Sequence, residues 1–293
     1  MQLDKDRVIP ILKAALKEDI GKGDITTHAL VENFQSAKAS IIVKEECVIC
    51  GLQIAEWLMA QVDYSVRFKP NAKDGKLVGS GKELAYLEGH AASILKAERT
   101  MLNFLSFLSG IATRTRAFVE KAGPYGVKIM DTRKTLPLLR YLEKYAVFTG
   151  GGANHRMGLY DQVLVKDNHI SCQLSALSFK QKNKNVAIKE LVERCRKRVP
   201  RDTVIEVEVS SVEEFSDALA GKPDIIMLDN MSVREVRSCV EVRRVSKAKP
   251  LLEVSGGIHL ENVEEYAKAR VDMISVGSLT NSVKSIDMSL EIV

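Results

Sequence analysis

Three short β-type runs in the middle of the chain each end in a cluster of basic or polar side chains. The runs cover residues 127–131, 145–148 and 163–166, and the clusters cover 132–134, 150–156 and 166–169. Cations are costly where strands are buried, unless an anion or a carboxylate compensates them. Because α/β folds bind ligands at the carboxyl ends of parallel strands, the repeated pattern favours one face that binds a small polyanion. Structural ion pairs with Asp131, Asp161 or Asp167 are the alternative.

The same alternation of strand and helix continues along the chain and predicts a barrel. Further β-type runs cover residues 204–209, 224–229, 251–254 and 272–276. The helices between them include two with capping-box sequences, beginning at Ser211 and Ser232. Strands separated by compact βα units indicate a parallel sheet. Counted from residue 127 there are seven, which predicts an incomplete seven-stranded α/β barrel and not a doubly wound sheet.

The first third of the chain predicts a separate α+β domain with an antiparallel sheet. Helical patterns at 4–18 and 53–61 alternate with β-type runs at 37–48, 65–68 and 84–87. A long helical pattern at 92–121 carries a stripe of polar or small residues, namely Arg99, Asn103, Ser106 and Gly110. Such a stripe allows close approach of another element or subunit. We expect an N-terminal α+β domain at 1–111 and a barrel at 112–279, with the tail 280–293 packing on the N-terminal domain as a short helix.

Composition argues against several other classes of protein. With 45% hydrophobic and 28% charged residues, the chain is typical of soluble globular proteins. No apolar run approaches the roughly 18 residues of a membrane span, and the start lacks a signal-peptide pattern. Five cysteines in no dense pattern suit the cytoplasm. Cys47 and Cys50 have metal-site spacing, but no second pair exists and their run is apolar, which favours buried strand cysteines. A net charge of +5 with 5% aromatic residues does not indicate nucleic-acid binding.

Two glycine turns follow the last two predicted strands. They are formed by Ser255, Gly256 and Gly257, and by Val276, Gly277 and Ser278. Backbone N–H groups exposed at glycines before helix N-termini bind phosphate, and barrels commonly place a phosphate site after their final strands. Ordinary tight βα turns are the alternative.

Glu208 and Asp229 end the two strands before these turns. Glu206 shares the face of Glu208, but Glu208 is nearer the carboxyl end. Two carboxylates opposite cations suit Mg²⁺ or ribose hydroxyls. Pairing with Arg133 or Lys166 is the alternative. No Ser-His-Asp order, H-E-x-x-H, P-loop or G-x-G-x-x-G sequence is present, so hydrolase, zincin, nucleotide-kinase and Rossmann readings lack support.

The ordered motifs DTRKT, GGGANHRMGLYD, KDNHI, EVEV, LDN, SGGI and VGSLT resemble the quinolinate phosphoribosyltransferase family, also called nicotinate-nucleotide pyrophosphorylase (carboxylating). The resemblance covers nearly the whole chain. It implies transfer from phosphoribosyl pyrophosphate to quinolinate with Mg²⁺, releasing pyrophosphate and CO₂ and giving nicotinate mononucleotide for NAD biosynthesis. It also implies a homodimer, or a higher oligomer, with each site shared between subunits.

The resemblance assigns a role to each matching position. Lys134, Lys166, Glu208 and Asp229 would be catalytic, and the two carboxylates would also hold Mg²⁺ and ribose hydroxyls. The substrate-binding set would be Arg99 from the neighbouring subunit, Thr132, Arg133, Lys134, His155, Arg156, Lys166, Glu208, Asp229, Ser255, Gly256, Gly257, Val276, Gly277 and Ser278. The 5′-phosphate would lie at the glycine turns.

Two departures from the family pattern and two rival functions remain. Leu136 and Leu138 stand where relatives often have a small residue or glycine, and the connection 172–185 is slightly long. One rival is a sister pyrophosphorylase encoded with molybdate transport, although the complete set of basic residues favours quinolinate. The other is a non-catalytic phosphate-binding barrel, which would not need Glu208 and Asp229.

Overall fold

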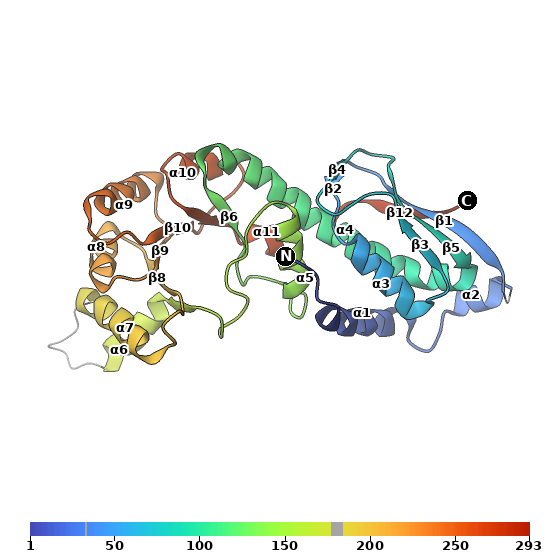
Figure 1. Ribbon diagram of the computed structural model, residues 1–293, viewed down its shortest axis with the longest axis horizontal. Coiled ribbons are helices and arrows are strands. Elements are labelled where there is room, and N and C mark those ends of the chain that lie inside the picture. The colour runs from blue at the N-terminus through green and yellow to red at the C-terminus, as the bar shows by residue number, and fades with distance from the viewer. Residues whose placement is uncertain (33, 177–183) are drawn as a thin grey trace. The chain divides into compact units, whose positions relative to one another are not determined.

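The structure is a computed structural model that describes residues 1–32, 34–176 and 184–293. Two compact units make up the chain and are described separately (Figure 1). Unit 1 comprises Met1–Arg116, Lys134–Gly152 and Leu279–Val293, and unit 2 comprises Ala117–Arg133 and Ala153–Ser278. The boundaries predicted from the sequence assigned residues 134–152 to the barrel, whereas these residues belong to unit 1. The predicted domain boundaries stay a prediction.

Unit 2 is built on one parallel sheet of six strands in the described residues, in the order β6-β11-β10-β9-β8-β7. The strands are β6 (Lys128–Met130), β7 (Val163–Val165), β8 (Ile205–Val209), β9 (Ile225–Asp229), β10 (Leu251–Ser255) and β11 (Met273–Ser275). The first strand along the chain pairs with the last, as it does when a sheet closes into a barrel. Next to β6, only Ala153 forms a bridge, to Met130. The α/β class and the incomplete barrel are therefore confirmed, but with six strands instead of seven.

Helices follow the strands of unit 2 around the outside of the sheet (Figure 1). They are α6 (Asp167–Ala176), α7 (Lys184–Arg198), α8 (Val212–Gly221), α9 (Val233–Val245) and α10 (Val263–Ala267). Both predicted caps form: the side chain of Ser232 makes a complete capping box with Glu235, and Ser211 accepts from the backbone of Glu214. Of the long connection predicted at 172–185, residues 177–183 lie outside the described residues.

Unit 1 contains an antiparallel sheet in the order β12-β1-β5-β3, which confirms the predicted α+β character. Its strands are β1 (Ser36–Val43), β3 (Arg67–Pro70), β5 (Glu83–His90) and β12 (Met288–Ile292), and β2 (Cys47–Val48) pairs with β4 (Leu77–Val78). The helices are α1 (Lys5–Ile20), α2 (Ile25–Leu30), α3 (Leu52–Val62) and α5 (Arg140–Thr149). The long helix α4 (Ala91–Ala122) begins in this unit, and the short α11 (Ser278–Asn281) ends in it.

Two predicted elements were wrong. Residues 145–148, expected as a strand, belong to α5, whose buried Tyr141, Leu142, Ala146 and Val147 recur at helical spacing. The tail, expected as a helix, forms strand β12, which pairs with β1 from Ala39↔Ile292 to Val43↔Met288. A four-residue apolar run cannot by itself distinguish a strand from one face of a helix. The residues before this run continue the same helical pattern, so the run belongs to helix α5.

Leu138 is one of the two leucines that depart from the family pattern. Its φ is 67°, in the left-handed region that glycine adopts without strain. Its side chain is also exposed, so packing does not compensate for this backbone conformation. A glycine is the residue that this turn favours.

Cys47 and Cys50 are both buried and free. Burial raises the pKa of the Cys47 thiol to about 11 and that of Cys50 well above its ordinary value. The deprotonated sulfur is the form that binds metals and exchanges disulfides. Burial therefore supports the interpretation of Cys47 as a buried strand cysteine, whereas Cys50 is buried but lies just after strand β2. Among the described residues, no helix is long and apolar enough to cross a membrane.

The small-residue stripe of α4 meets the tail within unit 1. The backbone N–H of Ile286 donates to the carbonyl oxygen of Ser106 at 3.1 Å, and a Cβ on Gly110 would clash with the carbonyl oxygen of Lys284. The predicted close approach of another element is therefore present.

We expect Gly110→Ala to lower the stability of unit 1 by about 1–3 kcal/mol, because a backbone atom must move to admit the methyl group. Thermal denaturation would report this as a lower Tm. Gly79→Ala is the matched control, since a Cβ there meets nothing within 4 Å. Equal Tm values for the two variants would contradict the assigned contact.

Candidate functional site

The parallel register of unit 2 brings polar side chains to one face at the strand ends. Glu208 pairs with Met227 and Ser255 pairs with Asp229, so residues alternating along these strands share that face. Lys166, which directly follows β7, reaches Glu208, with its Nζ 2.9 Å from Glu208 Oε2. The lysine side chain is 44% exposed and the glutamate 13%. The pairing of Lys166 with Glu208, which was the alternative to a magnesium or ribose role, is therefore present, and the pair is partly exposed.

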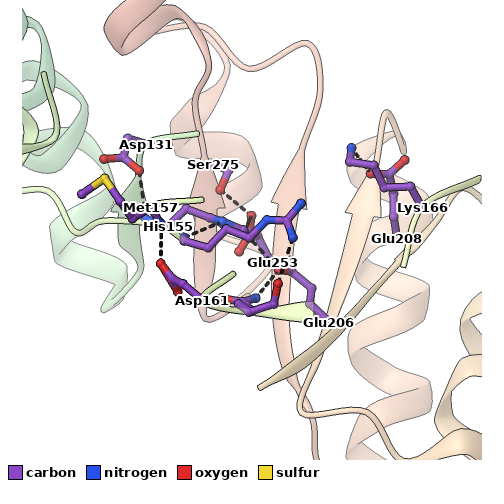
Figure 2. Close-up of polar contacts among 11 residues, drawn as sticks. Asp131, His155, Met157, Asp161, Lys166, Glu206, Glu208, Glu253 and Ser275 are labelled. Atoms are coloured by element: carbon purple, nitrogen blue, oxygen red, sulfur yellow. Dashed lines mark hydrogen bonds and ion pairs between the residues drawn. The ribbon is translucent and has the colours of Figure 1, made fainter. Parts of the chain in front are cut away.

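Glu206 points to the same face as Glu208 but is completely buried. Its Oε2 lies 3.0 Å from Nε2 of His155 and accepts a hydrogen bond from the side chain of Gln162 at 2.6 Å (Figure 2). Nε2 of His155 is also 3.7 Å from Oε1 of Glu253. Figure 2 shows this buried cluster apart from the pair of Lys166 and Glu208.

The hydrogen bonds around His155 favour a neutral imidazole. Its backbone N–H donates to the buried Asp131 at 2.9 Å, and its Nδ1 accepts from the backbone N–H of Arg156 at 2.8 Å. An imidazole nitrogen that accepts carries no hydrogen, so the ring proton is on Nε2, facing Glu206. His155 therefore contributes a hydrogen-bond donor, where the sequence pattern had placed it among the cations.

Arg156 is the buried cation of the site. It is 8% exposed, and its Nη1 donates to the carbonyl oxygen of Gln162 at 2.9 Å. Its Nε is buried and has no hydrogen-bond partner among the described residues. Burial, and next the charge of Arg133, lower the pKa of Arg156, while Glu206 and Asp161 oppose that shift. A buried guanidinium beside a second positive charge favours the binding of an anion.

Glu253 was not predicted as a site residue. It is 1% exposed and accepts a hydrogen bond from the hydroxyl of Ser275. Burial, and next the charge of Glu206, raise the pKa of Glu253. Its parity with Ser255 in the run 251–255 was a signal for an inward position. Glu206 was noticed in the same way but set aside because it lies deeper in the strand.

The first glycine turn brings its backbone close to Asn230. Gly256 and Gly257 have φ of 87° and 63°, and a Cβ on Gly256 would lie 2.8 Å from the backbone nitrogen of Asn230. That nitrogen donates to the carbonyl oxygen of Ser255 at 2.8 Å. The helix after this turn, α10, begins only at Val263, so the glycines do not directly precede a helix as expected. Glycine is nevertheless required for this close approach.

The second turn follows β11 directly. Val276 is buried and donates its backbone N–H to Met130 at 3.0 Å, and Ser278 begins α11. Thr132 and Arg133 follow β6 in the same unit.

Two predicted site residues, Lys134 and Arg99, belong to unit 1. The carbonyl oxygen of Lys134 accepts from the hydroxyl of Thr280 at 2.7 Å. Arg99 is exposed on α4 and lines a hollow of about 750 Å³ together with Asn103, Ser106 and Lys284. Both residues therefore belong to unit 1.

Glu208 and Asp229 fit the requirements of a magnesium ion. Both are carboxylates at the ends of adjacent strands and are partly exposed, so the ion could keep some of its water. Asp229 accepts a hydrogen bond from the side chain of Asn230 at 2.7 Å, which fixes its orientation. The three groups His155, Glu206 and Glu253 also lie within 4.8 Å of one another, but Nε2 of His155 carries a proton and has no lone pair for a metal.

These features define an α/β-barrel protein that binds an anionic small molecule at the carboxyl ends of its strands. Residues 24–109 match the N-terminal domain, and residues 111–291 the C-terminal domain, of the quinolinate phosphoribosyl transferase family. The chain belongs to this family.

Individual relatives agree over almost the full length. A probable nicotinate-nucleotide pyrophosphorylase (carboxylating) of Methanocaldococcus jannaschii is 44% identical over 99% of this chain and 98% of its own. The nicotinate-nucleotide pyrophosphorylase (carboxylating) of Mycobacterium leprae is 39% identical over 96% and 95%. The solved structure of nicotinate-nucleotide pyrophosphorylase from Francisella tularensis is 37% identical, with a TM-score of 0.89 over 100% of this chain and 98% of that one.

We expect Gly256→Ala to destabilise the barrel more than Gly257→Ala does. Both positions have positive φ and share that strain, but only the methyl group at 256 would displace Asn230. The difference in unfolding free energy should be about 1–3 kcal/mol. Chemical denaturation of the two purified variants measures it, and equal values would show that the turn relaxes without displacing Asn230.

Proposed function

We propose that the protein joins quinolinate to phosphoribosyl pyrophosphate and removes a carboxylate, giving nicotinate mononucleotide, CO₂ and pyrophosphate. The observation that carries the proposal is the buried guanidinium of Arg156, whose Nε is left without a partner among the described residues beside the like charge of Arg133. A dicarboxylate would supply oxygen atoms that can accept hydrogen bonds from this guanidinium. Relatives named nicotinate-nucleotide pyrophosphorylase (carboxylating) support this assignment.

The basic residues orient the acceptor. Arg133 and Arg156 can grip planar carboxylates bidentately, and Lys134 and Lys166 add positive charge. A neutral His155 accepts from the backbone of Arg156 through Nδ1 and donates to Glu206 through Nε2, so it fixes its neighbours without adding a further charge. Holding the ring in one orientation presents its nitrogen to the anomeric carbon of the ribose, and such positioning can supply a large part of a rate enhancement.

The carboxylates stabilise the donor. Departure of pyrophosphate leaves positive charge on the ribose, and Glu208 and Asp229 are placed at strand ends where they can stabilise that charge and accept from ribose hydroxyls. Magnesium held by the same carboxylates would neutralise charge on the leaving group. The glycine turns at 255–257 and 276–278 would bind the 5′-phosphate through backbone N–H groups.

Decarboxylation then needs little further chemistry from the protein. Once the ring nitrogen carries the ribose it is cationic, and it accepts the electrons left when the neighbouring carboxylate leaves as CO₂. A dry pocket strengthens that electrostatic effect. No protein nucleophile is required.

The proposal includes a homodimer in which Arg99 of one subunit completes the site of its partner. The exposed position of Arg99 at the edge of a hollow on α4 supports this role. We also propose a cytoplasmic location, which the five cysteines in no dense pattern support.

We expect the purified protein, incubated with quinolinate, phosphoribosyl pyrophosphate and Mg²⁺, to form nicotinate mononucleotide that is detectable by mass spectrometry. Nicotinic acid is the parallel substrate, because it lacks the carboxylate that is lost. Product from nicotinic acid alone would contradict the proposal. Absence of product from both would favour the sister pyrophosphorylase or the non-catalytic barrel.

We expect Arg156→Ala to weaken quinolinate binding about a hundredfold, because truncating a buried charged partner costs roughly 2–5 kcal/mol. Lys134→Ala should also weaken it, and neither substitution should prevent folding. Isothermal titration with quinolinate measures the affinity, and circular dichroism checks the fold. Arg237→Ala, which removes an exposed arginine on α9, is the matched control. Unchanged affinity in both site variants would refute their assignment.

We expect Arg99→Ala and Lys166→Ala to be inactive separately and to complement each other in mixed dimers. A heterodimer of the two variants has one site with both defects and one intact site. Random pairing makes about half of the dimers heterodimers, so the mixture regains about one quarter of wild-type activity and the purified heterodimer about one half. Co-expression with two affinity tags isolates the heterodimer. Absence of any rescue would place Arg99 within its own subunit's site or outside the site altogether.

A further inference from the structure

Four hydrogen bonds in unit 2 form a closed ring around Arg156. Its backbone N–H donates to Nδ1 of His155 at 2.8 Å, and its Nη1 donates to the carbonyl oxygen of Gln162 at 2.9 Å. The other ends of these two partners converge on one atom, because Oε2 of Glu206 accepts from Nε2 of His155 at 3.0 Å and from the side chain of Gln162 at 2.6 Å. Glu206 therefore holds both restraints on the arginine.

Most of the ring is buried. Glu206 is 0% exposed, the side chain of His155 is 7% exposed and Arg156 is 8% exposed, whereas Gln162 is half-buried. Partial shielding from water makes these bonds stronger than contacts at the surface. Glu206 does not touch Nε of Arg156, which is buried and has no hydrogen-bond partner among the described residues. The carboxylate thus restrains the arginine through its two neighbours.

We propose that Glu206 is a positioning residue for the acceptor site: it fixes His155 as the neutral Nε2–H tautomer and, through His155 and Gln162, aims the guanidinium of Arg156 at the ligand carboxylate. The identity of that ligand as quinolinate rests on the proposed function, whereas the tautomer and the ring do not. Glu253 and Ser275 close the pocket behind the imidazole, with Glu253 3.7 Å from Nε2.

This arrangement explains why acidic groups lie buried beside a site for an anion. A carboxylate that only neutralised Arg156 would compete with the ligand for the guanidinium. Glu206 instead accepts hydrogen bonds from an imidazole and an amide, so its charge favours Arg156 only at a distance and no carboxylate occupies the guanidinium directly. An imidazolium at position 155 would have no acceptor for the backbone N–H of Arg156, and the ring would open.

The first test measures the tautomer in the wild-type protein. Nitrogen-15 spectra of histidine-labelled protein report the protonation of each ring nitrogen, and His155→Asn assigns the signal among the five histidines. We expect a neutral ring with hydrogen on Nε2. An imidazolium, or a ring with hydrogen on Nδ1, would overturn the proposal, as would a bound metal ion at this ring found by elemental analysis of the wild type and lost in His155→Asn.

The second test separates positioning from general stability. Glu206→Leu removes the common acceptor, and we expect the KM for quinolinate to rise about tenfold, as the loss of a buried hydrogen bond to a charged group does. The KM for phosphoribosyl pyrophosphate should change less than about twofold, because the groups proposed to bind it, such as Glu208 and the glycine turns, make none of the four hydrogen bonds of the ring. Glu206→Gln keeps one oxygen that can accept both bonds, so its KM for quinolinate should stay within about threefold of wild type.

Ser109→Ala is the control for loss of a buried hydrogen-bonding group, since Ser109 is fully buried in unit 1 and bonds the backbone of Cys50. Equal increases in both KM values, or equal effects of the Leu and Gln variants, would reduce Glu206 to a structural role. If Glu206→Leu does not fold, the quinolinate KM of Glu206→Gln and the nitrogen-15 spectrum of His155 still test the positioning role. Failure of the proposed function would show instead as a wild-type protein without quinolinate turnover, whatever its tautomer.

Discussion

Charge that is taken out of water inside the barrel has to be compensated, and this constraint arranges the interior of unit 2. Asp131, Glu206 and Glu253 are almost fully inaccessible, and Arg156 nearly so. The carboxylates accept from neutral donors: Asp131 from an amide and a backbone N–H, and Glu206 from an imidazole and an amide. The charges of Glu206 and Asp161 also favour the charged form of Arg156. Hydrogen bonds from neutral donors and the nearby arginine together stabilise the buried carboxylates.

The strand ends were predictable because their signals are local. A β-type run followed by a polar cluster indicates a strand and its exit, and alternation along 204–209 indicates that Glu206 and Glu208 share a face. Helix caps at Ser211 and Ser232 have equally local signals, and both formed. The long motifs indicated the protein family, because their order and spacing over nearly the whole chain carry information that no single segment does.

Features that depend on distant partners could not be predicted. The charge state of His155 follows from the backbone N–H of the next residue and from a carboxylate 51 positions away, and sequence periodicity describes neither. The helical state of residues 145–148 was obscured because four apolar residues fit a buried strand equally well. The stripe on α4 indicated close packing, but only the structure identified the tail as the partner of Gly110.

The pairing of β12 with β1 also has a consequence for biosynthesis. Strand β1 ends at Val43 and its partner begins at Met288, so the ribosome must make the whole barrel segment before this sheet can be completed. During translation one edge of β1 offers unpaired N–H and C=O groups, which can recruit the wrong strand. Folding of the nascent chain therefore favours early closure of the barrel and late closure of the sheet, and chaperones would be needed most in that interval.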